Sequence, residues 1–187
     1  MSQNLNIKYL VEAAIFAALA MVLSFIPDFF SWFSPSFGAI PLILFALRRG
    51  LKYGLLSGFI WGLLHFVLGK VYYLSMSQIF IEYLLAFASM GLAGLFSGRL
   101  HQALTDQHTT KASNIALFGA FIATATRYLW HFLAGILFWG SYAPKGVSPV
   151  WYSFTVNGTT GAFTLILVTI AILILIQTQR QFFAPQD

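Results

Sequence analysis

Long stretches without a charged side chain run through most of this 187-residue sequence. Asp, Glu, Lys and Arg make up only 8% of the residues, against about 25% in an average soluble domain. So few charges cannot cover a water-facing surface, which excludes a soluble enzyme, a disordered chain and a nucleic-acid-binding protein. The uncharged stretches are residues 13–27, 29–47, 53–69, 71–81, 83–98, 112–126, 128–144 and 146–179. This pattern is typical of an integral membrane protein.

Six transmembrane helices account for these stretches. A spanning helix needs about 20 mainly apolar residues, so stretches separated only by Glu82, or only by Arg127, are pooled into one helix each. The second helix is short for a full crossing, and we expect it to be tilted or covered by protein. The predicted fold class is an all-α, integral membrane six-helix bundle, one transmembrane domain over 1–187. Its helices cover residues 7–27, 37–48, 53–69, 75–97, 113–139 and 152–176.

Basic residues predict how this bundle is oriented. Lys70 and Lys145 fall in loops on one side, whereas seven other basic residues fall on the opposite side. Because Lys and Arg are enriched in cytoplasmic loops, we expect both termini to be cytoplasmic in a multi-pass protein of the cell membrane. The outer loops are then residues 28–36, about 70–74 and 140–151. The seven residues on the predicted cytoplasmic side are Lys8, Arg48, Arg49, Lys52, Arg99, Lys111 and Arg180.

Small residues recur at four-residue spacing on three of the predicted helices. This spacing puts them on one helix face, where two backbones can approach closely. Ala14 and Ala18, on the first helix, form a face that could equally dock a partner protein. For the glycines we favour packing inside the bundle. They are Gly54, Gly58, Gly62, Gly94 and Gly98.

Glu82 interrupts an apolar stretch and is the first candidate for a functional site. A carboxylate at membrane depth costs several kcal/mol unless it is paired or faces a polar cavity. The structural alternative is an ion pair with Arg127. His131 lies four residues after Arg127, on the same helix face. Alone, such a histidine is more often a packing residue, but with Arg127 and Glu82 available a polar cavity is favoured.

Asn157 lies one turn into the last predicted helix. A buried Asn needs hydrogen-bond partners, and its two donors and its acceptor suit an edge such as that of an aminopyrimidine. An inter-helix hydrogen bond is an equally good interpretation.

Aromatic residues gather in the predicted outer loops and at the outer helix ends. They form either an interfacial belt or a cage for a flat or cationic ligand. Tyr83, next to Glu82, and Trp139, two turns beyond His131, are the best cage candidates. The whole set is Trp32, Phe33, Tyr72, Tyr73, Tyr83, Trp139, Tyr142, Trp151 and Tyr152.

Motifs of several enzyme classes are absent from the sequence. There is no G-x-x-x-x-G-K-[ST] phosphate loop, no H-E-x-x-H, no G-x-S-x-G and no cysteine. His101 and His108, in the hydrophilic loop 101–112, are expected to be solvated rather than metal ligands. The sequence therefore predicts a binding pocket without catalytic residues, metal or cofactor, and one carboxylate among aromatic rings favours an organic cation.

The residues of this pocket lie in segments that resemble the YuaJ family. These are the thiamine-specific substrate-binding (S) components of the energy-coupling factor transporters. The resemblance covers nearly the whole chain and is specific through the combination Glu82-Tyr83, His131…Trp139 and Tyr152…Asn157-Gly158. One departure is Arg127, where the family often has Lys. The matching segments lie within residues 40–50, 74–83, 127–139, 142–146 and 152–158.

The resemblance implies the S-component fold and a vitamin importer that performs no covalent chemistry. Thiamine, a cationic thiazolium joined to an aminopyrimidine, would be captured near the extracellular face under a lid formed by residues 28–38. Ala14 and Ala18 would dock the transmembrane coupling subunit, whose two ATPase partners supply the energy. Two alternatives remain: an S component or stand-alone facilitator for another cationic heterocycle, and an intramembrane enzyme that uses Glu82 and His131 as an acid–base pair.

The resemblance also implies roles for the site residues. Glu82 would meet the cationic or the aminopyrimidine part of the vitamin, and Trp139 and His131 would flank a ring. Tyr152 and Asn157 would form hydrogen bonds with polar edges of the vitamin. The pocket would also be lined by Trp32, Tyr72 and Tyr83. Arg127 and Gly135 would belong to the site as parts of the matched helix.

Overall fold

The computed structural model describes residues 6–26 and 34–184, which form helices and no strand. The six predicted helices are confirmed, with shifted ends. Within the described residues, three segments are long and apolar enough to cross a membrane: Met76–Thr105, Thr109–Phe138 and Pro149–Thr178. The helices are α1 (Ile7–Leu23), α2 (Ala39–Arg49), α3 (Leu51–Val67), a continuous fourth helix built from α4 to α6, α7 (Thr109–Phe138) and α8 (Pro149–Thr178).

The fourth helix is wound irregularly. A π-helical turn, η1 (Phe80–Leu85), follows α4 (Met76–Ile79), and a 3₁₀ segment, η2 (Ser89–Phe96), follows the short α5 (Ala86–Ala88). In the π turn the Ala86 N–H donates to the Ile81 carbonyl five residues earlier. Such turns are rare and frequently lie at functional sites.

Three predicted helix boundaries differ from the structure by four residues or more: the fifth helix begins at Thr109 rather than at 113, and the first and fourth helices end elsewhere. The first helix stops at Leu23 rather than 27, and the Ser24 hydroxyl donates back to the Ala20 carbonyl. The fourth helix does not stop at 97 but continues through α6 (Ser97–Thr105), so the predicted loop 101–112 shrinks to residues 106–108.

The two histidines of that predicted loop have different surroundings. His101 is half-buried on α6, and its Nε2 is enclosed without a hydrogen-bond partner among the described residues, so the prediction that it is solvated was wrong. His108 is exposed, as predicted.

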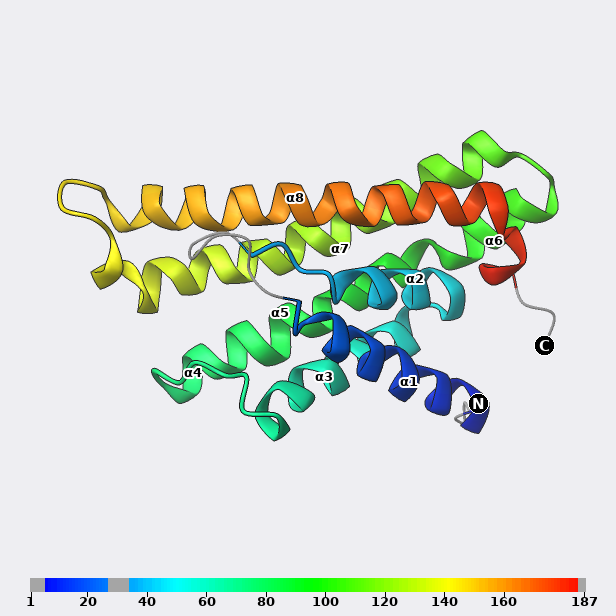
Figure 1. Cartoon of the computed structure of the whole chain (residues 1–187). Coiled ribbons are helices and arrows are strands. Elements are labelled where there is room, and N and C mark those ends of the chain that lie inside the picture. Colours follow the sequence, from blue (N-terminus) through cyan, green and yellow to red (C-terminus); the bar gives the residue numbers. More distant parts are fainter. Residues whose placement is uncertain (1–5, 27–33, 185–187) are drawn as a thin grey trace.

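Figure 1 shows α7 and α8 side by side along one side of the bundle, with α1, α2 and α3 on the other. The start of α1, the α6–α7 turn and the end of α8 lie at one end. Helix α4 and the α7–α8 loop lie at the opposite end. The short α2 is buried along most of its length, which confirms that protein covers it. Only Gly50, with a φ of +85°, separates α2 from α3.

Glycines bring α3 against the fourth helix. A Cβ on Gly58 would lie 2.4 Å from the Phe87 carbonyl oxygen, and one on Gly62 would lie 2.1 Å from the Tyr83 carbonyl oxygen. The packing interpretation is confirmed for these residues and for Gly54 and Gly94, but it was wrong for Gly98, which faces open space. Close backbone contact therefore holds η1, with Glu82, against α3.

We expect Gly62→Ala to lower the free energy of unfolding by about 1–3 kcal/mol, because the added methyl group overlaps a backbone oxygen that cannot move freely. Thermal unfolding of the purified protein in detergent measures the effect. Gly98→Ala is the matched control, since its methyl group would meet nothing within 4 Å. Equal stability of the two variants would contradict the account of this packing.

Candidate ligand-binding site

Glu82 lies in the π turn with its side chain only 12% exposed. Trp139 Nε1 donates to its Oε1 at 3.0 Å, and Gln78 Nε2 donates to its Oε2. Both donors are neutral, so they hold the carboxylate in place without cancelling its charge. The side chain is thus a fixed negative group at the edge of a cavity.

Arg127 does not neutralise this carboxylate. Its Nη1 donates to Ser36 Oγ at 2.8 Å, and its guanidinium carbon lies 4.8 Å from the centre of the Trp61 ring and 4.7 Å from that of Phe87. The side chain is buried, and its Nε has no hydrogen-bond partner among the described residues. The ion pair considered as an alternative is therefore not formed in the described part of the chain.

His131 and Asn157 connect the two long helices beside Glu82. His131 Nδ1 on α7 lies 3.9 Å from Glu82 Oε1, beyond hydrogen-bond distance. Asn157 Nδ2 on α8 donates to the His131 carbonyl at 3.3 Å and to the Ser153 carbonyl at 3.1 Å. Asn157 thus makes the inter-helix hydrogen bond considered above, and it also lines the cavity.

Three neighbouring cavities meet at His131. The first, here called the Glu82 cavity, has a volume of about 380 Å³. A second, of about 570 Å³, shares Glu82, His131 and Trp139 with it and is also lined by Tyr72 and Tyr83. The Glu82 cavity is lined by Glu82, His131, Gly135, Trp139, Tyr142, Tyr152, Ser153, Val156 and Asn157.

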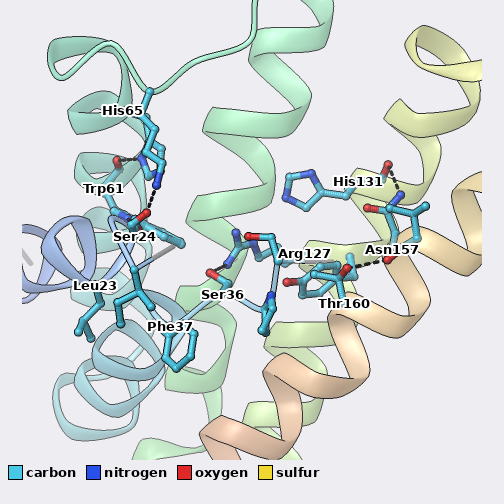
Figure 2. Close-up of a pocket in the computed structure, with 16 residues that line it drawn as sticks. Leu23, Ser24, Ser36, Phe37, Trp61, His65, Arg127, His131, Asn157 and Thr160 are labelled. Atoms are coloured by element: carbon cyan, nitrogen blue, oxygen red, sulfur yellow. Dashed lines mark hydrogen bonds between the residues drawn. The ribbon is translucent and has the colours of Figure 1, made fainter. Parts of the chain in front are cut away.

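Figure 2 shows the third cavity, of about 320 Å³. Trp61 and His65 lie on one side of it and His131 and Asn157 on the other, with Arg127 between them. The space therefore extends from a carboxylate at Glu82 to a guanidinium at Arg127.

Aromatic rings border the carboxylate. The Trp139 ring lies edge-on to that of Tyr72 at 6.3 Å and is tilted against that of Tyr142 at 5.5 Å. Tyr83 is buried, and its hydroxyl accepts a hydrogen bond from the Tyr72 N–H at 2.9 Å. The half-buried Tyr152 completes this wall.

Other predicted aromatic residues lie away from the cavities or outside the described residues. Tyr73 and Trp151 are exposed and line none of the three cavities, as expected of an interfacial belt. Trp32 and Phe33 lie outside the described residues. Of the predicted lid, 34–38 are described, and Ser36 N donates to Thr164 Oγ1 on α8 at 2.9 Å.

Gly135 allows α8 to approach α7 at the site. A Cβ there would lie 2.1 Å from Ser153 Oγ and 3.2 Å from Asn157 Nδ2. Any side chain at this position would displace groups that line the Glu82 cavity.

Sequence reasoning missed Gln78 and Ser153 as site residues. Gln78 is fully buried and bonds Glu82, and the Leu74 N–H donates to its Oε1 at 3.2 Å. The available signal was its spacing, four residues before Glu82 on one helix face. Ser153 donates to the Phe132 carbonyl at 2.8 Å and accepts from Asn157.

The predicted docking residues lie outside the site. Ala14 and Ala18 are both exposed on α1, whereas Ala13 and Ala17 on the same helix are buried. The small-residue face of α1 is therefore open in the described structure.

Known proteins resemble this chain over almost its full length. ThiT, a thiamine transporter from Lacticaseibacillus paracasei, is 36% identical over 192 residues, covering 100% of this chain and 96% of the relative. ThiT from Bacillus subtilis is 32% identical over 183 residues, 95% of each protein. A solved structure of ThiT from Listeria monocytogenes is similar with a TM-score of 0.90 and 43% identity, covering 95% of this chain and 97% of that one.

A family model described as thiamine transporter protein (Thia_YuaJ) matches residues 10–184. The relatives are named as transporters, and the long apolar helices fit that name. The chain is therefore a multi-pass membrane protein that belongs to the thiamine transporter family.

Proposed function

We propose that this protein binds thiamine in the Glu82 cavity and serves as the substrate-binding subunit of a vitamin importer. The observation that carries the proposal is the Glu82 carboxylate, which two neutral donors hold beside the Trp139 indole. A fixed negative charge next to an electron-rich ring favours a flat organic cation. The names of the relatives support thiamine as that cation.

The geometry favours binding over catalysis. His131 Nδ1 and Glu82 Oε1 are 3.9 Å apart, beyond hydrogen-bond distance, and Glu82 accepts from Trp139 and Gln78 instead, so the structure does not favour an acid–base pair. Thiamine offers a positive thiazolium and an aminopyrimidine with donors and acceptors on its edge. Glu82 would meet the cation or the amine, Trp139 and His131 would lie against a ring, and Asn157 and Tyr152 would contact polar edges.

Isothermal titration of the detergent-solubilised protein tests this proposal. We expect saturable binding of one thiamine per chain. Oxythiamine, which carries a carbonyl in place of the pyrimidine amine, should bind at least about tenfold more weakly because a donor is replaced by an acceptor. Equal affinity for both compounds, or no binding of either compound, would contradict a site that recognises the aminopyrimidine edge.

Basic residues support capture from the extracellular side. Lys8, Lys111 and Arg180 lie at the end of the bundle where α1 and α7 begin and α8 finishes. Lys/Arg-rich ends stay cytoplasmic, so both termini would be inside. The Glu82 cavity lies nearer the opposite end, by α4 and the α7–α8 loop, and would open outward.

The open face of α1 supports assembly with the coupling subunit of an energy-coupling factor transporter. The sequence has no phosphate loop of its own, so ATP would be used by two partner subunits. Ala14 and Ala18 are small, exposed and one turn apart, which suits close approach of a helix from another protein.

We expect Ala14→Trp to leave thiamine affinity unchanged but to abolish uptake into vesicles that contain the partner subunits. The bulky ring would hold the partner helix away from α1, far from the cavity. Ile170→Trp, at an exposed position on α8, is the matched control. Normal uptake by the Ala14 variant would show that this face is not the docking surface, and uptake without any ATPase would favour a facilitator.

A further inference from the structure

A separate groove of about 570 Å³ lies between the fourth helix and α7, near the α6–α7 turn. It shares no lining residue with the three cavities around His131. Two of its lining residues are basic, and none of those described is acidic. The lining residues are Phe96, Arg99, Thr110, Lys111, Asn114, Ile115 and Phe118.

Polarity changes in the same direction along both walls. On α7 the lining runs from Lys111 to Phe118, about 10 Å deeper at 1.5 Å per residue. On the other wall, Arg99 lies nearer the turn than Phe96. The groove is therefore cationic towards the end of the bundle and aromatic towards its middle.

The deeper part of the groove continues into surface suited to acyl chains. The Phe96 and Phe118 rings meet edge to face, with centres 5.3 Å apart, and form an aromatic floor. Beyond it, Leu95 is 55% exposed and Phe121 50% exposed. Both lie in segments long and apolar enough to cross a membrane, so lipid would cover them.

The cationic part of the groove offers side chains that can bind an anion. Arg99 and Lys111 are exposed, and neither forms an ion pair within the part of the chain that the structure describes. Thr110 and Asn114 add a hydroxyl and an amide to the same wall. Basic pockets between transmembrane helices on the cytoplasmic side suit the headgroups of anionic lipids.

We propose that this groove binds an anionic phospholipid. Its phosphate would contact Arg99 and Lys111, and its acyl chains would lie along Phe96 and Phe118. A phospholipid fits both parts of the groove, whereas a soluble anion would use only the cationic part and a neutral lipid only the apolar part. The proposal does not depend on the ligand of the Glu82 cavity.

Native mass spectrometry of the purified protein tests this inference. With equimolar phosphatidylglycerol and phosphatidylcholine of identical acyl chains, the wild type should retain mainly phosphatidylglycerol. The double variant Arg99→Gln/Lys111→Gln should retain it about tenfold less, since each basic residue near an anionic headgroup contributes several-fold. Phe118→Ser, at a half-exposed position, should weaken retention of the lipid without changing the charge.

Lys52→Gln/Arg180→Gln is the matched control, because it removes two exposed charges from the same end of the bundle outside the groove. It should retain phosphatidylglycerol as the wild type does. Equal retention of the two lipids by the wild type, or an equal loss in both double variants, would overturn the proposal. Displacement of phosphatidylglycerol by millimolar inorganic phosphate, with no effect of Phe118→Ser, would instead indicate a soluble-anion site and would also overturn it.

Discussion

Glu82→Gln is expected to weaken thiamine binding by about 1.5–3 kcal/mol, the usual worth of a hydrogen bond to a charged group. This corresponds to a rise in Kd of roughly ten- to 150-fold. The amide keeps the shape of the side chain and one oxygen that can accept from Trp139, whereas its NH2 group would face the Gln78 Nε2 donor, so the variant removes the negative charge together with the hydrogen bond from Gln78. Titration by intrinsic tryptophan fluorescence measures the change, since Trp139 borders the cavity.

Glu12→Gln is the control for the loss of a carboxylate elsewhere in the bundle. Glu12 pairs with Arg49 at 2.6 Å and Arg48 at 3.5 Å and lines none of the cavities around His131. Its variant should bind thiamine as the wild type does. An unchanged Kd for Glu82→Gln would remove Glu82 from the site.

Trp139→Ala should cost about 2–4 kcal/mol of binding free energy, in the range of a buried aromatic anchor. The change removes the ring that would lie against the ligand and also the N–H that orients Glu82. Trp139→Phe keeps a ring but no donor, so its affinity should fall between those of the wild type and the Ala variant. Isothermal titration calorimetry measures all three without relying on tryptophan emission.

Trp151→Ala tests whether the loss of thiamine affinity in the Trp139 variants comes from the site itself or from the loss of any aromatic residue that anchors the protein in the membrane. Trp151 is exposed and lines none of the three cavities, so the variant should bind thiamine normally. Similar losses for the Trp139 and Trp151 variants would indicate that the membrane belt, and not a ring contact with the ligand, governs affinity.

The fold was largely predictable because uncharged stretches of spanning length leave few other folds open. The main error, the end of the fourth helix, has a physical cause. In α6 the buried residues Leu100 and Ala103 alternate with the exposed Arg99 and Gln102, so the segment is amphipathic. Because of this polar face, a prediction based only on uncharged stretches assigns the segment to a loop.

The charged and aromatic residues of the candidate site could be predicted from the sequence, but the backbone conformation that positions them could not. Glu82, His131 and Trp139 come together as expected, because charges and polar rings at membrane depth need a shared cavity. The π turn that carries Glu82 packs against α3 where Gly62 approaches the Tyr83 carbonyl, a tertiary contact that composition does not reveal. Gln78 was missed because a neutral side chain in an apolar run gives no charge signal.

A crystal structure of the thiamine complex is the most direct test of the central claim, that the Glu82 carboxylate and the Trp139 ring together form the vitamin site. The account predicts thiamine in the Glu82 cavity, with a polar or cationic group within hydrogen-bond distance of Glu82 and a ring against Trp139. Thiamine bound elsewhere, for example beside Arg127 in the third cavity, with Glu82 still occupied by Gln78 and Trp139 alone, would contradict it.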